Sequence, residues 1–125
     1  MKAVMVDTDF LIDVERGKAS LPKAQLFLSW ISLYEFLRGR KDFLIAKEKL
    51  EKVFIILLPS NEVLRKSVEI YRDLRSRGEL IEERDLLVGA TAISFGLPLL
   101  TKNRSHYERL TRYGLVLQDW RLPTS

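Results

Sequence analysis

The sequence predicts a single α/β domain in which helices cover both faces of a parallel sheet of about five strands. Short apolar runs, such as residues 2–6 and 53–58, alternate with longer segments of helical periodicity. This alternation is typical of parallel sheets, because each parallel pair of strands needs a crossover connection. The 125 residues contain no internal repeat, low-complexity tract or linker, so residues 1–125 are expected to form one domain.

The first half of the chain is expected to begin with a buried strand and a short helix. Thr8 is a candidate cap for this helix, Gly17 ends it, and Pro59 closes the last strand of this half. The expected elements are, in order, strand 2–6, helix 9–16, strand 25–29, helices 32–39 and 42–52, and strand 53–58.

The second half is expected to contain two long helices and two strands. Ser60 caps the first helix, which ends at Gly78, and its apolar stripe consists of Val63, Leu64, Ser67, Val68, Tyr71 and Leu74. The helix over 82–95 is apolar on nearly every side, so it should be central and buried. The remaining expectations are strand 97–101, an edge strand over 115–117, and an edge flap or dimer contact from Trp120 onward.

Polar side chains follow several of these strands. Asp7 ends the first strand, Glu35 lies about one and a half helical turns after the second, and Asp85 opens the buried helix. Thr101 and Asn103 close the fourth strand. In open α/β sheets, ligands bind outside the carboxyl ends of the strands, where the strand order reverses. We therefore expect these five residues at one edge of the sheet.

Three acids that converge would need a cation, because neighbouring carboxylates raise one another's pKa. With no cysteine and one histidine in the chain, hard oxygen ligands favour Mg²⁺ or Mn²⁺. Each acid also has a structural interpretation. Asp7 could cap a strand end, Asp85 could suit a first helical turn, and Glu35 could pair with Arg38. Their coincidence at one edge favours a metal site that binds a phosphodiester and activates water.

The charge distribution is compatible with an anionic partner. The net charge is +4, and the cations gather in three clusters. The clusters are Arg38, Arg40 and Lys41; Arg72, Arg75 and Arg77; and Lys102, Arg104, Arg109 and Arg112. One cluster alone would be interpreted as a solvated helix face, but the three together make nucleic acid a candidate partner.

The same sequence argues against a secreted or membrane protein. No apolar run approaches the about 20 residues that cross a bilayer, and the first residues lead directly into a strand. The absence of cysteine excludes disulfides. We expect a soluble, cytoplasmic protein.

Four segments, in chain order, resemble the motifs of the PIN domain. They are VMVDTDFLID (4–13), LSWISLYEFLRG (28–39), DLLVGATAI (85–93) and LLTKNRSHY (99–107). The length also resembles that of the VapC toxins of type II toxin–antitoxin pairs. The resemblance implies a three-layer α/β/α fold and a ribonuclease that uses Mg²⁺ or Mn²⁺ to hydrolyse RNA phosphodiester bonds. It also implies a homodimer and a cognate antitoxin that blocks the cleft.

Carried over by position, the resemblance makes Asp7, Glu35 and Asp85 the catalytic and metal-binding acids. Thr8 would orient Asp7 or the phosphate, and Thr101 and Asn103 would support the site. The candidates for RNA contact are Arg38, Arg40, Lys102 and Arg104.

His106 departs from the motif, because many PIN domains carry a fourth acid at this position. It is either a structural residue or a group that contacts RNA phosphate or lends a proton near pH 7. In both cases the second metal site loses a charged ligand, so we expect one firm metal and a weaker second. The acids that could compensate are Glu82, Glu83 and Glu108.

Two other functions remain open. A PIN fold that binds RNA or protein without cleaving is the first, and His106 supports it. The second is a haloacid-dehalogenase-like phosphatase, suggested by Asp7 and Asp9, although Phe10 and Leu11 do not fit its motif and the chain is short for that fold.

The sequence also predicts the positions of several other residues near the motifs. Asp9 is expected to be a first-turn acid that reaches metal through water, and Asp13 a solvated or capping residue. Trp30 and Tyr34 are expected in the core, and Tyr107 is expected to pack below the site.

Overall fold

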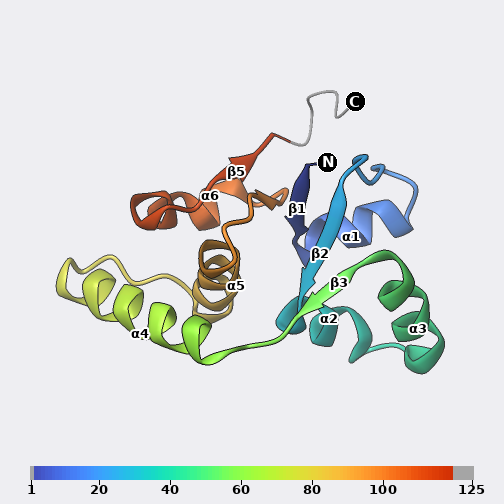
Figure 1. The fold of residues 1–125 in the computed structure, drawn as a ribbon, viewed down its shortest axis with the longest axis horizontal. Coiled ribbons are helices and arrows are strands. Elements are labelled where there is room, and N and C mark those ends of the chain that lie inside the picture. Colours follow the sequence, from blue (N-terminus) through green and yellow to red (C-terminus); the bar gives the residue numbers. More distant parts are fainter. Residues whose placement is uncertain (1, 120–125) are drawn as a thin grey trace.

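A five-stranded parallel sheet forms the middle layer of the structure, a computed structural model that describes residues 2–119 (Figure 1). The strands are β1 (Ala3–Val6), β2 (Gln25–Ser29), β3 (Ile55–Leu57), β4 (Leu99–Leu100) and β5 (Leu117–Gln118). Their order is β3-β2-β1-β4-β5, and every pair is parallel. The order reverses at β1, so the carboxyl end of β1 is the expected position of a ligand site.

Helices cover both faces of the sheet, which confirms the predicted α/β architecture (Figure 1). They are α1 (Thr8–Glu15), α2 (Trp30–Leu37), α3 (Phe43–Val53), α4 (Asn61–Ser76), α5 (Glu83–Ser94), α6 (Arg104–Tyr107) and the 3₁₀ helix η1 (Glu108–Tyr113). Met5 packs in a core with α4, α5 and η1, whereas Val4 and Val6 pack in a second core with α1, α2 and α3. This division follows from the alternation of side chains along a strand.

The helix α5 lies at the centre of the first core, as its apolar sequence predicted. The residues from Leu86 to Ala92 are buried except Leu87. Gly89 permits a close approach to η1, because a Cβ added there would lie 2.2 Å from Leu110 Cδ1. None of the helices in the part of the chain that the structure describes is long and apolar enough to cross a membrane.

Several predicted boundaries are wrong for local reasons. Asp7, not Thr8, caps α1: its carboxylate accepts a hydrogen bond from the Thr8 amide at 2.8 Å. The predicted strand 53–58 is shorter, because α3 continues through Val53. The last strand begins two positions later than predicted, at Leu117. The helical segments α6 and η1 have four and six residues, which is too short for a helical period to show in the sequence. Trp120 and the residues after it lie outside the described residues, so the expectation for them stays a prediction.

The predicted stripe of α4 is only partly correct. Val63, Ser67 and Leu74 are buried together with Ile70, whereas Leu64 and Val68 are exposed at 62% and 47%. The buried positions follow i, i+4, i+7 and i+11 spacing, which keeps them on one line along the helix.

The expectation that Trp30 and Tyr34 lie in the core is also wrong. Their side chains are 47% and 51% exposed, and their rings stack with 5.8 Å between centroids. The two aromatic residues, four positions apart, lie side by side on α2 and line one apolar groove together with the buried Leu33 and Leu37.

Candidate active site

Asp7 stands at the carboxyl end of β1 and is almost completely buried, with 1% exposure. Its Oδ1 accepts hydrogen bonds from the Thr8 amide at 2.8 Å and from Arg84 Nη2 at 2.6 Å. Its Oδ2 accepts from the Thr101 hydroxyl at 3.0 Å and from the Tyr107 hydroxyl at 2.7 Å. Groups from four segments therefore fix the orientation of this carboxylate.

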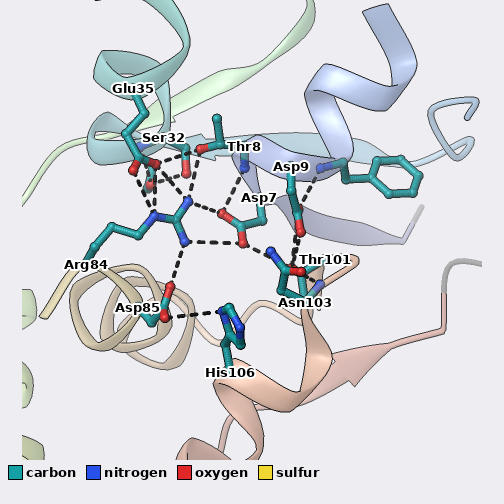
Figure 2. Close-up of polar contacts among 12 residues, drawn as sticks. Asp7, Thr8, Asp9, Ser32, Glu35, Arg84, Asp85, Thr101, Asn103 and His106 are labelled. Atoms are coloured by element: carbon teal, nitrogen blue, oxygen red, sulfur yellow. Dashed lines mark hydrogen bonds and ion pairs between the residues drawn. The ribbon is translucent and has the colours of Figure 1, made fainter. Parts of the chain in front are cut away.

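Two further carboxylates face the same point from different helices (Figure 2). Glu35 lies on α2, and its Oε1 accepts a hydrogen bond from the Thr8 hydroxyl at 2.9 Å. Asp85 lies in the first turn of α5 and is 5% exposed. The structure thus brings together the three acids that the sequence placed at one edge of the sheet.

The centre of this group is occupied by Arg84, which the sequence analysis did not single out (Figure 2). Its Nε lies 2.9 and 3.0 Å from the two carboxylate oxygens of Glu35, and its Nη2 lies 2.8 Å from Oε1 of the same residue. Its Nη1 donates to Asp85 Oδ1 at 3.0 Å and to the Tyr107 hydroxyl at 2.5 Å. Together with the bond to Asp7, one guanidinium bridges all three acids.

A signal for Arg84 was present in the sequence. A cation in the first turn of a helix meets the positive end of the helix dipole, which is unfavourable unless acids compensate it. Arg84 occupies such a position on α5, directly before Asp85. A basic residue there, beside three converging acids, could have been expected to pair with them.

The acids keep the guanidinium charged. Burial alone would lower the pKa of Arg84, but the hydrogen bonds that it donates to Glu35 and Asp7 and the charge of Asp7 raise the pKa overall. Burial raises the pKa of Tyr107, and the nearby charge of Asp7 raises it further, so the phenol stays protonated and donates to Asp7.

Asp9 and Asp13 lie on the side of Asp7 that faces β4. Asp9 is in the first turn of α1, as expected, and accepts hydrogen bonds from the Phe10 amide at 2.6 Å and the Lys102 amide at 3.1 Å. Burial and the charge of Asp7 raise the pKa of Asp9. Asp13 binds the Lys102 ammonium, and this hydrogen bond lowers the pKa of Asp13.

The fourth motif supplies Thr101, Asn103 and His106. The buried Thr101 hydroxyl contacts Asp7 and also lies 3.2 Å from Asp9 Oδ2, while it accepts from the Asn103 amide at 3.1 Å. His106 Nδ1 lies 3.7 Å from Asp85 Oδ2, and the imidazole side chain is 58% exposed (Figure 2). His106 therefore borders the acids on the side open to solvent.

The candidates for RNA contact all have partners elsewhere in the chain. Arg40 pairs with Glu15 at 2.6 Å and with Asp42 at 3.3 Å. Lys102 binds Asp13, Arg104 donates to the Gln118 carbonyl at 3.0 Å, and Arg38 lies over the ring of Tyr34.

The acids that could compensate for His106 are placed differently from one another. Glu82 lines a cavity of about 260 Å³ together with Asp85, His106 and Arg109. Glu83 instead faces an apolar groove beside α4, and Glu108 begins η1. Of the three, Glu82 is the acid that shares a cavity with Asp85.

The donor set suits a hard divalent cation, because three carboxylates and a hydroxyl already surround a positive charge. Within residues 2–119, however, no three His, Asp or Glu side chains are positioned to hold a metal ion as they stand. The guanidinium of Arg84 separates the carboxylates. The residues therefore fit Mg²⁺ or Mn²⁺ in their chemistry, on condition that Arg84 moves.

Comparison with known protein families and sequences finds similarity to the PIN domain and to VapC ribonucleases. A model of the PIN domain matches residues 4–112. "Ribonuclease VapC1" of Methanocaldococcus jannaschii is 36% identical over 123 residues, which cover 93% of this chain and 87% of that protein. "Ribonuclease VapC1" of Rickettsia felis is 32% identical over 120 residues, which cover 86% of this chain and 90% of that protein.

Solved structures are similar over nearly the whole chain. The VapBC-1 structure from nontypeable Haemophilus influenzae contains a chain with a TM-score of 0.77 and 25% identity, covering 96% of this chain and 99% of that one. The structure of DNA-bound VapBC from Salmonella typhimurium gives a TM-score of 0.81 at 22% identity, with coverage of 96% and 99%.

Proposed function

The chain belongs to the PIN-domain family and to its VapC ribonucleases, and on this premise we propose that the acids at the end of β1 form a metal-dependent endoribonuclease centre. The protein is a VapC-type toxin ribonuclease of a toxin–antitoxin system. The observation that carries the proposal for the site is the convergence of Asp7, Glu35 and Asp85 on one cation position (Figure 2).

In this proposal Asp7, Glu35 and Asp85 would hold Mg²⁺ or Mn²⁺. When bound, the ion would lower the pKa of the attacking water and neutralise charge on the phosphodiester. The chain's own groups prepare the site. Thr8 holds Glu35, and Tyr107 and Thr101 hold Asp7, so the carboxylates are oriented before RNA arrives.

RNA would approach from the solvent side of the acids. The partly exposed side chains on that side are Glu35 at 20%, Arg84 at 27% and His106 at 58%. His106 would contact a phosphate oxygen or donate a proton to the leaving oxygen when its imidazole is charged. The cations proposed to contact the RNA backbone, after exchanging their present partners for phosphate, are Arg38, Arg40, Lys102 and Arg104.

One firm metal and a weaker second fit this arrangement better than two equal metals. His106 stands beside Asp85, at the position where the resemblance to the PIN motif implies an acid, so the proposed second position lacks that negative ligand. Asn103 and Thr101 can orient groups at that position, but neither brings a charge.

A protein partner is part of the proposal. The similar solved structures include VapBC-1 of nontypeable Haemophilus influenzae and a toxin–antitoxin complex from Klebsiella pneumoniae, which supports a cognate antitoxin for this chain. An apolar groove of about 400 Å³ along α2 and α3 also supports a protein partner, since its lining includes the exposed rings of Trp30, Tyr34 and Phe43. We further propose a homodimer that acts in the cytoplasm on its RNA target.

The function is tested by incubating a labelled, structured RNA pool with Mg²⁺, with Mn²⁺ and with EDTA. Asp7→Asn should abolish cleavage, because the isosteric amide removes the charge at the centre of the site. Asp42→Asn is the matched control, since Asp42 is exposed and pairs with Arg40 away from the acids. Metal-dependent cleavage by the wild type and by Asp42→Asn, but not by Asp7→Asn, is the expected result.

Two other outcomes would favour the other functions. RNA that is bound but not cleaved, with binding unchanged by EDTA and by Asp7→Asn, would indicate a binding module. Hydrolysis of a chromogenic phosphoester with the RNA left intact would indicate a phosphatase.

A further inference from the structure

Arg84 places all five of its guanidinium N–H donors in the acid centre. The Nε hydrogen goes to Glu35, the two on Nη1 go to Asp85 and Tyr107, and the two on Nη2 go to Asp7 and Glu35. Only a planar guanidinium, with five donors in a fixed geometry, can pair in this way. The side chain of Arg84 therefore occupies a well-defined position among the acids.

We propose that Arg84 is an internal competitor of the divalent ion, which occupies the centre of the acids in the metal-free protein and withdraws when the ion binds. The inference rests on the proposed function and deepens it, because it names the residue that sets the metal affinity of the site. Arg84 itself would not be a ligand of the ion.

Competition follows from the atoms that the two cations share. Asp7 Oδ1, Glu35 Oε1 and Asp85 Oδ1 each lie between 2.6 and 3.0 Å from a guanidinium nitrogen. Mg²⁺ requires its oxygen ligands at about 2.0–2.1 Å in a near-octahedral arrangement. The same three oxygens cannot surround a small ion while a guanidinium stands between them, so one cation excludes the other.

The side chain that moves in this exchange is Arg84. Asp7 is 1% exposed and is also fixed by Thr8, Thr101 and Tyr107. Arg84 is 27% exposed at its side chain and has a long, flexible stem. It can therefore rotate toward solvent, whereas Asp7 cannot leave the end of β1 without breaking its other hydrogen bonds.

Withdrawal also places the guanidinium where RNA would arrive. Arg84 remains charged outside the acids, and a planar fork suits bidentate contact with a phosphate. Metal binding would thus both complete the acid site and free an arginine at its entrance.

The test compares metal affinity in the wild type, in Arg84→Gln and in the control Arg65→Gln. Arg65 is a matched arginine that also pairs with two acids, Glu62 and Glu69, but on the exposed face of α4. Mn²⁺ binding is measured by the loss of the free-ion electron paramagnetic resonance signal, and Mg²⁺ binding by calorimetry. We expect Arg84→Gln to bind Mn²⁺ about tenfold or more tightly than the wild type. This is the gain in affinity that follows if the wild-type acids are free of Arg84 in about 10% of the molecules and are always free in the variant.

A second measurement observes Arg84 itself. In the metal-free wild type, the Arg84 Nε–H resonance should be protected from solvent exchange by Glu35, and titration with Mg²⁺ should remove that protection. A resonance that stays protected at saturating Mg²⁺ would overturn the proposal.

The remaining outcomes separate this inference from the proposed function. Equal or weaker metal binding by Arg84→Gln overturns the competition alone, provided that the wild type still cleaves RNA with metal and not with EDTA. No metal binding by either protein overturns both. If Arg84→Gln does not fold without metal, Arg84→Lys carries the test, because an ammonium cannot satisfy the three acids as a fork does, and it should give an intermediate affinity.

Discussion

The phenolic oxygen of Tyr107 lies 2.7 Å from Asp7 Oδ2, and its hydroxyl donates a hydrogen bond that joins α6 to the end of β1. The ring is fully buried, and the same oxygen accepts a hydrogen bond from Arg84. Tyr107 therefore packs below the site, as its position in the motif implied, and also holds the central carboxylate in place.

Replacement of Tyr107 by phenylalanine should reduce both stability and activity. The buried Asp7 carboxylate would lose one donor and Arg84 one acceptor, which should cost about 1–3 kcal/mol in the free energy of unfolding. We expect RNA cleavage to fall about 10-fold or more, as for other groups that orient metal ligands. Urea unfolding and single-turnover cleavage measure the two effects. Tyr113→Phe, which removes a hydroxyl bound to Asp73 far from the acids, should leave cleavage unchanged.

Thr101 should act through Asp7 and not as a ligand. Thr101→Val keeps the shape of the buried side chain but removes the hydroxyl that donates to Asp7 at 3.0 Å. We expect cleavage at saturating metal to fall about 10- to 100-fold. Thr101→Ser retains the hydroxyl and should keep most of the activity. Equal losses in the two variants would show that the methyl group, and not the hydrogen bond, is what matters.

His106→Asp should strengthen the second metal position. The new carboxylate would stand beside Asp85, from which His106 Nδ1 is now 3.7 Å away, and would supply the missing negative charge. We expect half-maximal cleavage at a metal concentration about 10-fold lower than in the wild type. His106→Gln, which has no charge, should not lower that concentration. Metal titration of cleavage by each protein makes the comparison.

Strand topology accounts for the acids that the sequence could predict. Asp7 and Glu35 follow β1 and β2, whose carboxyl ends meet at one edge of the parallel sheet, and Asp85 opens α5, the helix that leads into β4 and therefore begins at the same edge. Their convergence depends on connectivity and not on fine packing. The burial of α5 was predicted correctly, because a helix that is apolar on all sides has no polar face to expose to solvent.

Other features depend on contacts between distant side chains. Arg84 reaches Glu35 across 49 positions in sequence and Asp7 across 77, and no local pattern encodes where a long side chain will lie. Trp30 and Tyr34 were expected in the core from their residue type. They are exposed because they line an open groove along α2 and α3, beside the buried Leu33 and Leu37. The turns of 104–113 are too short to show a helical period.

Gly89→Ala should destabilise the fold although alanine favours helices. The added Cβ would lie 2.2 Å from Leu110 Cδ1, and Leu110 is fully buried, so α5 and η1 would have to separate or Leu110 would have to change rotamer. We expect a loss of about 1–3 kcal/mol in the free energy of unfolding. Gly39→Ala is the control, because its Cβ would meet nothing within 4 Å. A neutral Gly89→Ala would show that Leu110 repacks freely.

Tyr113 and Asp73 should make stability depend on pH at both ends of the range. The Tyr113 hydroxyl donates to Asp73 at 2.5 Å, and this hydrogen bond, helped by Arg77, lowers the pKa of Asp73 below its ordinary value of 3.8. A carboxyl whose pKa is lowered by folding stabilises the fold above 3.8, and the contribution is lost as the pH falls through the lowered pKa.

The phenol behaves in the opposite sense at high pH. Burial and Asp73 raise the pKa of Tyr113 above 10.0, so its contribution is present below 10.0 and is lost as the pH rises through the raised pKa. Tyr113→Phe should therefore be less stable than the wild type at neutral pH, with the difference shrinking below pH 3.8 and above pH 10.0. Urea unfolding across this range measures the difference, and carbon NMR of the Asp73 carboxyl should show its pKa rising in the variant. A difference that is constant with pH would mean that the two groups do not interact in solution.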